Sequence, residues 1–413
     1  MAQVAHARVD ARFRAEQLAA SVVREAARTR PIRFSVEQDL GAVERDWRAF
    51  EAGAELTVFQ TFDWLSTWQR HIGSRTGVRP AIVVARDAEG ILFILPLATR
   101  DRAFIRELTW LGSELCDYNA PLLASDFSGR CGGAAFADLW AEIAALLQSD
   151  ARHRFDVVQF TNMPAMVGSQ PNPMLALGVV VHPSGAYATR LGDDWESFYA
   201  SKRSSTTRRR DRTKRKRLGE FGEVRLVNPQ RVDDILAALD VLMQQKAHQF
   251  ARMGVGNLFA KPGHADFYCA LASDPLTRPL AHVSCLEVGP TPAAVNLGLI
   301  WRGCYYHLLA SYDDGERARF GPGAAHLHDL LKLAIERGLT VFDFTVGDEP
   351  YKRDWSDSEI ALYDHVAAAR WRGALIVLPL IVVLRVKRWI KQTPVMWRIF
   401  TAARARLGRG LAR

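Results

Sequence analysis

The stretch FDFTVGDEPYKRDW, residues 342–355, begins as a short apolar strand and continues as a cluster of charged and aromatic side chains. Alternation along a strand puts Asp343 on the face opposite the flanking phenylalanines, and Gly347 permits a sharp turn. Loops at strand ends often carry binding residues. We therefore expect Lys352 to bind a negatively charged group and Trp355 to close over it. The alternative is a solvated patch of ion pairs that contributes little to stability.

A second candidate lies just upstream, where Gly321-Pro322-Gly323 follows a strand-like run and precedes a helical pattern that ends at Gly338. Proline suits the first turn of a helix, and glycines let backbone N–H groups approach a ligand closely. The start of a helix after such a turn can hold an anion, and Arg317 and Arg319 could add charge-assisted contacts. The alternative is a plain helix start with a tight turn.

Charge is concentrated in two places. The run 202–217 holds ten Lys and Arg residues against one acid, and residues 365–413 hold eleven Lys and Arg and no Asp or Glu, within a chain of net charge +9. The run 202–217 predicts a solvated helix face, a clamp for phosphates, a contact to RNA or a contact to an anionic membrane surface. No aromatic residue interrupts the run, so stacking on single-stranded nucleic acid is not indicated.

The 413 residues suffice for two or three domains with a sizeable core. The five cysteines are scattered and form no CxxC pair, which fits a reducing compartment and indicates neither a disulfide framework nor a zinc site. No apolar signal segment opens the chain. The apolar stretch 374–384 is too short to span a bilayer and predicts a buried helix or an interfacial anchor flanked by Arg, Lys and Trp.

Strands and helices alternate in two rounds. Each round predicts three strand-like runs, a helix and a further strand: residues 79–110, 134–147 and 155–160 in the first, and 280–312, 322–338 and 340–347 in the second. Phe155-Asp156 and Phe342-Asp343 follow their helices at the same offset, which predicts a weak internal repeat. The fold class is therefore α/β, with two similar units.

Four segments together resemble the BioF2-like acyltransferase family, GNAT-type proteins associated with cellulose or other exopolysaccharide biosynthesis and related to the Fem peptidoglycan aminoacyltransferases. They are FQTFDWLSTWQRHIG, the basic helix from residue 201, HLLASYDDGERARFGPGAAHLHDLLKLAIERG and FDFTVGDEPYKRDW. The resemblance covers roughly residues 32–366. It implies tandem GNAT-like units, each a mixed, largely antiparallel sheet flanked by helices.

The resemblance also implies an acyl-CoA co-substrate whose diphosphate rests on the turn at the start of the helix at 322. Its binding residues would be Arg317, Arg319, Gly321, Gly323 and Ala324. The GNAT pattern has Arg or Gln three residues before the first glycine. Ala318 stands there in this chain, and the arginines lie one step to either side.

Acyl transfer to an amine needs a base, an oxyanion donor and an acid for the leaving thiolate. Asp313 and Asp343 are the candidate bases, and Tyr312 or Tyr351 is the candidate acid. Tyr351 is also expected, with Lys352 and Trp355, to bind the acceptor. Neither His326 nor His328 has a carboxylate partner at ligand spacing, so no metal is predicted.

We expect a cytoplasmic acyl-CoA-dependent N-acyltransferase that acts on an amino sugar or another envelope or exopolysaccharide precursor, and the resemblance implies that it is an acetyltransferase. The alternatives are a Fem-type transferase that uses aminoacyl-tRNA, with nucleic acid as a partner in that case alone, and a non-catalytic factor at the membrane surface. The basic tail would give peripheral contact with the inner face of the membrane. The expected domains are an N-terminal extension (1–30), a first lobe (31–180), a second lobe with the acyl-CoA site (181–366) and a basic, apolar helical tail (367–413).

Overall fold

The computed structural model describes residues 31–131, 136–375 and 377, which form two compact units. Unit 1 holds the described residues within 31–62, 79–180 and 363–377; unit 2 holds 63–78 and 181–362. Residues 63–78 thus belong to unit 2 although they precede most of unit 1 in the chain. The expected extension 1–30 and most of the tail 367–413 lie outside the described residues.

Unit 1 is built on a mixed sheet with the strand order β1-β2-β3-β4-β6-β17-β9, with β5 pairing β3. The four leading strands pair antiparallel, and β4 then pairs parallel with β6. Its principal elements are β1 (Arg33–Glu37), α2 (Leu40–Glu51), β2 (Arg79–Asp87), β3 (Gly90–Arg102), β4 (Ile105–Trp110), β5 (Leu122–Leu123), α4 (Phe127–Arg130), α5 (Phe136–Ser149), β6 (Val157–Pro164), β9 (Val180–Val181) and β17 (Leu362–Ala368).

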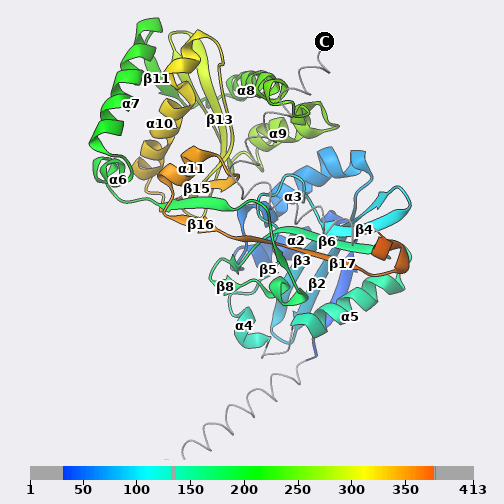
Figure 1. The fold of residues 1–413 in the computed structure, drawn as a ribbon. Helices are drawn as coiled ribbons and strands as arrows, with labels where there is room; N and C mark the ends of the chain where they lie inside the picture. The colour runs from blue at the N-terminus through cyan, green and yellow to red at the C-terminus, as the bar shows by residue number, and fades with distance from the viewer. Residues whose placement is uncertain (1–30, 132–135, 376, 378–413) are drawn as a thin grey trace, which may run out of the picture. The chain divides into compact units, whose positions relative to one another are not determined.

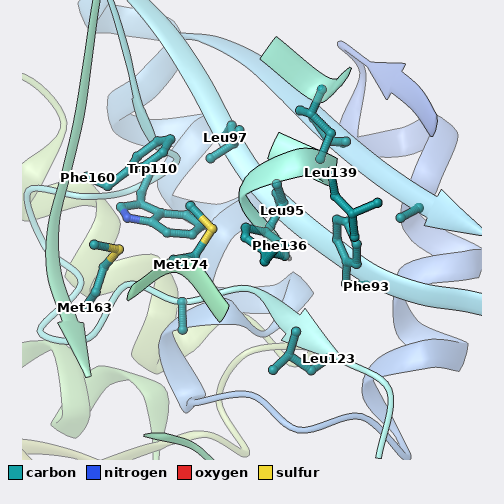
Figure 2. Close-up of a cluster of buried hydrophobic side chains, with 14 of the residues drawn as sticks. Phe93, Leu95, Leu97, Trp110, Leu123, Phe136, Leu139, Phe160, Met163 and Met174 are labelled. Carbon is teal, nitrogen blue, oxygen red and sulfur yellow. The ribbon is translucent and has the colours of Figure 1, made fainter. Parts of the chain in front are cut away.

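The core of unit 1 is a continuous apolar layer between this sheet and α5 (Figure 2). Phe93 on β3 is fully buried, and its ring contacts Phe34, Phe127 and Phe136 at centroid distances of 6.3, 6.1 and 5.8 Å. Trp110 packs similarly on Phe160, at 5.0 Å. Aromatic rings thus bridge the strands and helices of unit 1 and fix their packing.

Unit 2 repeats this plan with the strand order β11-β12-β13-β14-β15-β10-β16. In Figure 1, α10 lies against one side of the strands that include β13, and α8 and α9 lie against the other. Its principal elements are α3 (Phe62–Trp68), β10 (Ala186–Arg190), α6 (Trp195–Lys202), α7 (Ser205–Leu218), β11 (Val224–Val227), α8 (Val232–Met253), α9 (His264–Ser273), β12 (Ala281–Val288), β13 (Thr291–Trp301), β14 (Cys304–Tyr312), α10 (Pro322–Glu336), β15 (Val341–Val346), α11 (Pro350–Trp355) and β16 (Ser358–Ile360).

The two units share one topology. In each, three antiparallel strands lead to a helix and then to a strand that pairs parallel with the third, as β4 with β6 and β14 with β15. The pairing begins at Val157 in unit 1 and at Val341 in unit 2. Phe155 and Phe342 each follow the end of the preceding helix, Ser149 and Glu336, by the same number of residues, as the predicted repeat requires.

The basic run starts at the last residue of α6, Lys202, and most of it forms a separate helix, α7. Arg203 adopts an extended conformation that ends α6, and the Ser204 side chain then accepts the Thr207 N–H at 3.2 Å to cap α7. N-caps of this kind satisfy donors that the first helical turn leaves open. The break lets α7 take a direction different from that of α6 and run beside α10 (Figure 1).

Within the described part of the chain, the structure has no helix of the length and apolarity that crossing a bilayer requires.

Truncating Phe93 tests the core of unit 1. We expect Phe93→Ala to lower the free energy of unfolding by about 3–5 kcal/mol, because a fully buried ring is replaced by a cavity. Urea denaturation would measure it. Phe104→Ala is the matched control: that ring is 64% exposed, so we expect a change within about 0.5 kcal/mol. Equal effects of the two variants would contradict the described packing.

Candidate functional site

The site in unit 2 begins where two parallel strands part. β14 and β15 pair only from Cys304 with Val341 to Tyr306 with Asp343, and beyond that point β15 continues beside β10 alone. The parted strands leave a gap in the sheet, and the backbone lining such a gap can bind part of a ligand.

Both strands are irregular at the parting. Tyr306 and Leu309 of β14 pair with Leu299 and Leu297 of β13. Two residues lie between the first two and one between the second two, so β14 carries one extra residue there. On β15, Asp343 and Thr345 face consecutive residues of β10, which marks an extra residue on β15. Bulges of this kind re-aim side chains and are frequent beside active sites.

Thr345 has φ 60°, a left-handed conformation that a β-branched residue rarely adopts. Three contacts hold it: its N–H donates to Asp343 Oδ1 at 2.7 Å, its hydroxyl donates to the His307 carbonyl at 3.4 Å, and its own carbonyl accepts from Lys352 Nζ at 3.4 Å. Backbone strain of this kind persists where the surroundings enforce it, and it clusters at functional sites.

Lys352 is buried and turned toward the end of β15. Its ammonium donates to the Val346 carbonyl at 2.8 Å and lies 3.3 Å from the Glu349 carboxylate. A Cβ at Gly347 would lie 2.8 Å from the Lys352 nitrogen, and Gly347 has φ 144°, so the turn requires glycine. Lys352 therefore fixes the backbone at the parting, a role that the sequence did not predict.

Buried imidazoles lie between the sheet and α10. The Nε2 of His326 on α10 is 2.9 Å from the Ser284 hydroxyl, and His282 Nδ1 is 3.0 Å from the Tyr305 hydroxyl. Burial lowers the pKa of His326 to about 3 and that of His282 to about 4. The pKa of His307, at the parting, is also lowered to about 3, by burial and then by the charge of Lys352. All three rings are therefore neutral at pH 7.

Two further groups border the parting. Burial lowers the pKa of Lys246 on α8, and Glu349 opposes this effect while Lys352 adds to it. The Tyr351 ring contacts the rings of His307 and Phe344, and burial raises its pKa above the ordinary range. Tyr351 therefore keeps its proton at neutral pH and lies where β14 and β15 separate.

The predicted anion turn opens α10. Gly321 is left-handed with φ 67°, Pro322 takes the first helical position, and no side chain caps the helix. A Cβ on Gly323 would lie 3.1 Å from the Tyr312 ring, so Tyr312 packs against this turn. The first-turn amides of Gly323 and Ala324 thus lie at the positive end of the α10 dipole, as an anion site requires.

A pocket of about 110 Å³ lies at this turn. α7 provides one wall of it, and the Lys214 ammonium would be 3.9 Å from a Cβ on Gly321. The lining residues are Tyr199, Arg203, Asp211, Arg212, Lys214, Arg215, Phe320, Gly321, Ala324, Ala325, His328 and Trp355. The start of α10 and part of the basic run therefore face one cavity.

α7 is held over the pocket by specific contacts. Arg215 binds both carboxylate oxygens of Asp329 on α10 at 2.9 Å, and the Tyr199 hydroxyl donates to Asp211 at 2.9 Å. Leu218 is fully buried at the end of the helix. Among the pocket bases, Arg215 is therefore paired with Asp329, whereas Lys214 and Arg212 form no ion pair with any described residue.

Trp355 forms the aromatic side of the pocket. Its ring stacks on those of Phe198 and Tyr199 at 6.3 and 5.9 Å, and the Arg203 guanidinium lies 4.4 Å above it. Trp355 is only 3% exposed, so it supports the wall of the pocket from within the aromatic cluster.

The predicted site residues fall into two groups. Asp343, Tyr351 and Lys352 lie at the strand parting, whereas Gly321, Gly323, Ala324, Tyr312 and Trp355 lie at the turn or its pocket. Asp313 follows Tyr306 by seven residues on an extended strand, roughly 20 Å, so it is not beside Asp343.

The predicted arginines are engaged elsewhere. Arg317 donates to the Asp313 carboxylate at 2.8 and 3.1 Å, and neither residue lines the pocket. Arg319 lies over the Phe320 ring and reaches Glu316 at 3.3 Å. The structure instead brings Lys214 of the neighbouring helix α7 close to Gly321, which makes Lys214 a candidate for the contact predicted for the loop arginines.

Sequence reasoning did not single out Lys214, Thr345, Lys246 or the pair of Ser284 and His326. Lys214 was one of ten bases in its run, and only its proximity to Gly321 distinguishes it. Within the described residues, no group of three or more His, Cys, Asp or Glu side chains is arranged to bind a metal ion.

Comparison with known proteins supports the fold and the domain. Residues 205–353 match the family model described as an acetyltransferase (GNAT) domain, and no curated protein matches the chain. FemX is similar in structure at 12% identity and a TM-score of 0.53, over 78% of this chain and 96% of its own. A protein of unknown function from Bacteroides thetaiotaomicron is similar in structure at 10% identity and a TM-score of 0.50, over 80% of this chain and 99% of its own.

A tandem GNAT protein from the clavulanic acid biosynthesis pathway aligns at 13% identity and a TM-score of 0.46, over 82% of this chain and 99% of its own. The GNAT domain and the predicted fold of tandem GNAT-like units are confirmed. The narrower branch associated with cellulose synthesis stays a prediction.

Replacing Asp343 tests whether its carboxylate supports the backbone at Thr345. We expect Asp343→Ala to lower the free energy of unfolding by about 1–3 kcal/mol, because the buried Thr345 N–H loses its acceptor. Asp343→Asn keeps an acceptor oxygen at this position, so we expect it to lose less than about 1 kcal/mol. Urea denaturation of both variants measures the difference, and an unchanged midpoint for Asp343→Ala would refute the supporting role.

The buried histidines make the stability of unit 2 depend on pH. Their folded pKa values lie below the unfolded value, so the unfolded state binds more protons between about pH 6.5 and 3. The free energy of unfolding should fall as pH falls through this window. His326→Gln should flatten the slope, whereas the exposed His248→Gln should not. Denaturant titrations at several pH values would show it; parallel slopes for the two variants would contradict the assignment.

Proposed function

We propose, from the GNAT domain over residues 205–353, that this protein transfers an acyl group from an acyl-CoA to an amine. The observation that carries the proposal is the combination of parted strands β14 and β15 with a pocket of bases at the start of the next helix, α10. A diphosphate at the turn and a thioester at the parting would use both features at once.

The donor's diphosphate would lie at the start of α10. The amides of Gly323 and Ala324 can donate to its oxygens, and Lys214 with Arg212 adds positive charge from α7. Helix amides alone bind anions weakly in water, so the bases of α7 supply much of the attraction.

The reaction would take place at the parting. The amine attacks the thioester carbonyl, the oxyanion forms, and the carbon–sulfur bond then breaks. A main-chain N–H at the β14 bulge, near Leu308, is suited to stabilising that oxyanion. Tyr351 is protonated and near the bulge, so it is the residue placed to give the leaving thiolate a proton.

The amine must also lose a proton. Of the two predicted bases, Asp343 lies at the parting, and Asp313 is bound to Arg317 roughly 20 Å along the strand. Asp343 is therefore the proposed base, and Lys352 supports the backbone beside it. The acceptor would be an amino sugar or another precursor of the envelope or an exopolysaccharide, as the family resemblance implies.

One observation favours a second donor. Four of the eight bases of α7 are exposed and lie outside the pocket lining, namely Arg209, Arg210, Lys216 and Arg217, and a basic helix of this kind suits an RNA backbone. Similarity in fold to FemX agrees with a Fem-type transferase that uses aminoacyl-tRNA. The third possibility, a non-catalytic factor, requires that neither donor bind.

Thermal shift with CoA, acetyl-CoA and aminoacyl-tRNA tests the donor. Acetyl-CoA at a hundred times its dissociation constant should stabilise the folded protein by about 2.7 kcal/mol. Lys214→Ala should weaken CoA binding roughly ten-fold, because it removes a charged contact to phosphate. Arg209→Ala, on the same helix but outside the pocket, should bind CoA as the wild type does.

The outcomes separate the donors. Stabilisation by aminoacyl-tRNA but not by CoA, with a loss in Arg209→Ala, would replace the acyl-CoA proposal with the Fem-type one. Stabilisation by no donor would overturn both and leave a non-catalytic protein.

A further inference from the structure

A second cavity lies in unit 1. Its volume is about 390 Å³, and it is lined by Asp101, Ala103, Phe104, Ile105, Arg106, Arg154, Asp156, Arg370 and Arg372. It lies at the tip of the hairpin between β3 and β4, next to the segment that follows β17. The GNAT domain over residues 205–353 includes none of these residues.

The cavity has an excess of positive charge. Four arginines face two aspartates, and the aspartates are already bound: Asp101 by Arg79 and Arg106, and Asp156 by the Arg106 N–H at 2.9 Å. In the part of the chain that the structure describes, Arg370 and Arg372 form no ion pair. Four arginines against two aspartates leave an excess of two positive charges, so the cavity attracts an anion.

Large exposed apolar side chains lie on the segments that form this cavity: Phe104 lines it, and Trp371 and Leu375 belong to the helical turn that supplies Arg370 and Arg372. Phe104 is 64% exposed, Trp371 72% and Leu375 65%, among the highest values for apolar residues in the described chain. Trp371 and Leu375 are four residues apart in one helical turn and therefore share a face. Phe104, Trp371 and Leu375, together with the arginines of the cavity, are called the Arg–aromatic surface below.

The hairpin itself does not need Phe104. The equivalent hairpin of unit 2, between β13 and β14, turns at Arg302-Gly303 with φ 45° and 74°. Tight hairpins favour glycine, asparagine or aspartate at such positions. In unit 1 the tip is Ala103-Phe104, with Ala103 at φ 49°, so turn geometry does not account for a large ring there.

The other half of the surface is fixed in place. The Asp156 carbonyl accepts the N–H groups of Ala369 at 2.8 Å and Arg370 at 3.3 Å. A Cβ on Gly373 would lie 2.0 Å from that same carbonyl, so only glycine allows the helical turn to approach. Trp371 and Leu375 are therefore presented to solvent by a turn that is anchored to the start of β6.

We propose that the Arg–aromatic surface binds a bilayer that contains anionic phospholipids. A lipid phosphate occupies the cavity and is held by Arg154, Arg370 and Arg372. Phe104, Trp371 and Leu375 enter the headgroup region, where amphipathic and aromatic side chains are stabilised.

Charge and chain composition both favour a membrane over another partner. The chain continues from this surface into residues that carry further Lys and Arg and two more Trp, with no Asp or Glu up to Arg413. Juxtamembrane bases gain free energy at anionic leaflets. This inference does not rest on the identity of the acyl donor.

Flotation of the full chain with vesicles tests the proposal. We expect binding to phosphatidylcholine vesicles that contain phosphatidylglycerol, and at least roughly ten-fold weaker binding to pure phosphatidylcholine. The double variant Arg370→Gln/Arg372→Gln should bind anionic vesicles roughly ten-fold less tightly. Phe104→Ala/Trp371→Ala should also lose affinity, whereas Leu276→Ala, an equally exposed leucine of unit 2, should not.

A second arm distinguishes the source of the phosphate. Inorganic phosphate at buffer concentrations should leave the bound fraction nearly unchanged, because the apolar contacts remain. Failure of the wild-type chain to float, unchanged binding in both double variants, or complete displacement by inorganic phosphate would each overturn the proposal. Thermal unfolding of the variants confirms that any loss is not a loss of fold.

Discussion

The left-handed backbone of Thr345 is the constraint that fixes where β14 and β15 part, and the candidate site in unit 2 depends on that parting. A β-branched residue does not adopt that conformation unaided, and here Asp343, Lys352 and the His307 carbonyl enforce it. The turn of the chain at this point ends the pairing of β15 with β14 and directs β15 toward β10. The gap in the sheet is thus a consequence of the buried polar contacts that hold Thr345.

This constraint links the two ends of the candidate site. The strand that leaves the parting, β14, runs directly to the turn that opens α10, and Tyr312 at its end packs on Gly323. α7 closes the same end through Arg215 and Asp329, whose pKa is lowered because hydrogen bonds from His328 and Arg215 outweigh its burial. One rigid strand therefore sets the separation between the place for phosphate and the place for an acyl group.

The sequence predicted the regular elements well and the site only in part. Strand alternation and helix caps located β12 to β15, α8 and α10, and the glycines around Pro322 identified the turn, because these signals are local. Thr345 gave no signal, since its conformation depends on contacts from His307 and Lys352 that only the fold brings together. Lys214 gave no signal of its own, because it was one of ten bases in its run and only the fold brings it to Gly321.

The contrast between the two hairpin tips has an evolutionary consequence. Both tips begin with a non-glycine residue in the left-handed region, Ala103 and Arg302, but the next residue is an exposed phenylalanine in unit 1 and a left-handed glycine in unit 2. Where two units share a topology, their sequences can differ at positions that strand pairing does not constrain. A tip that tolerates an exposed ring is such a position, and it is there that related chains should diverge most between their halves.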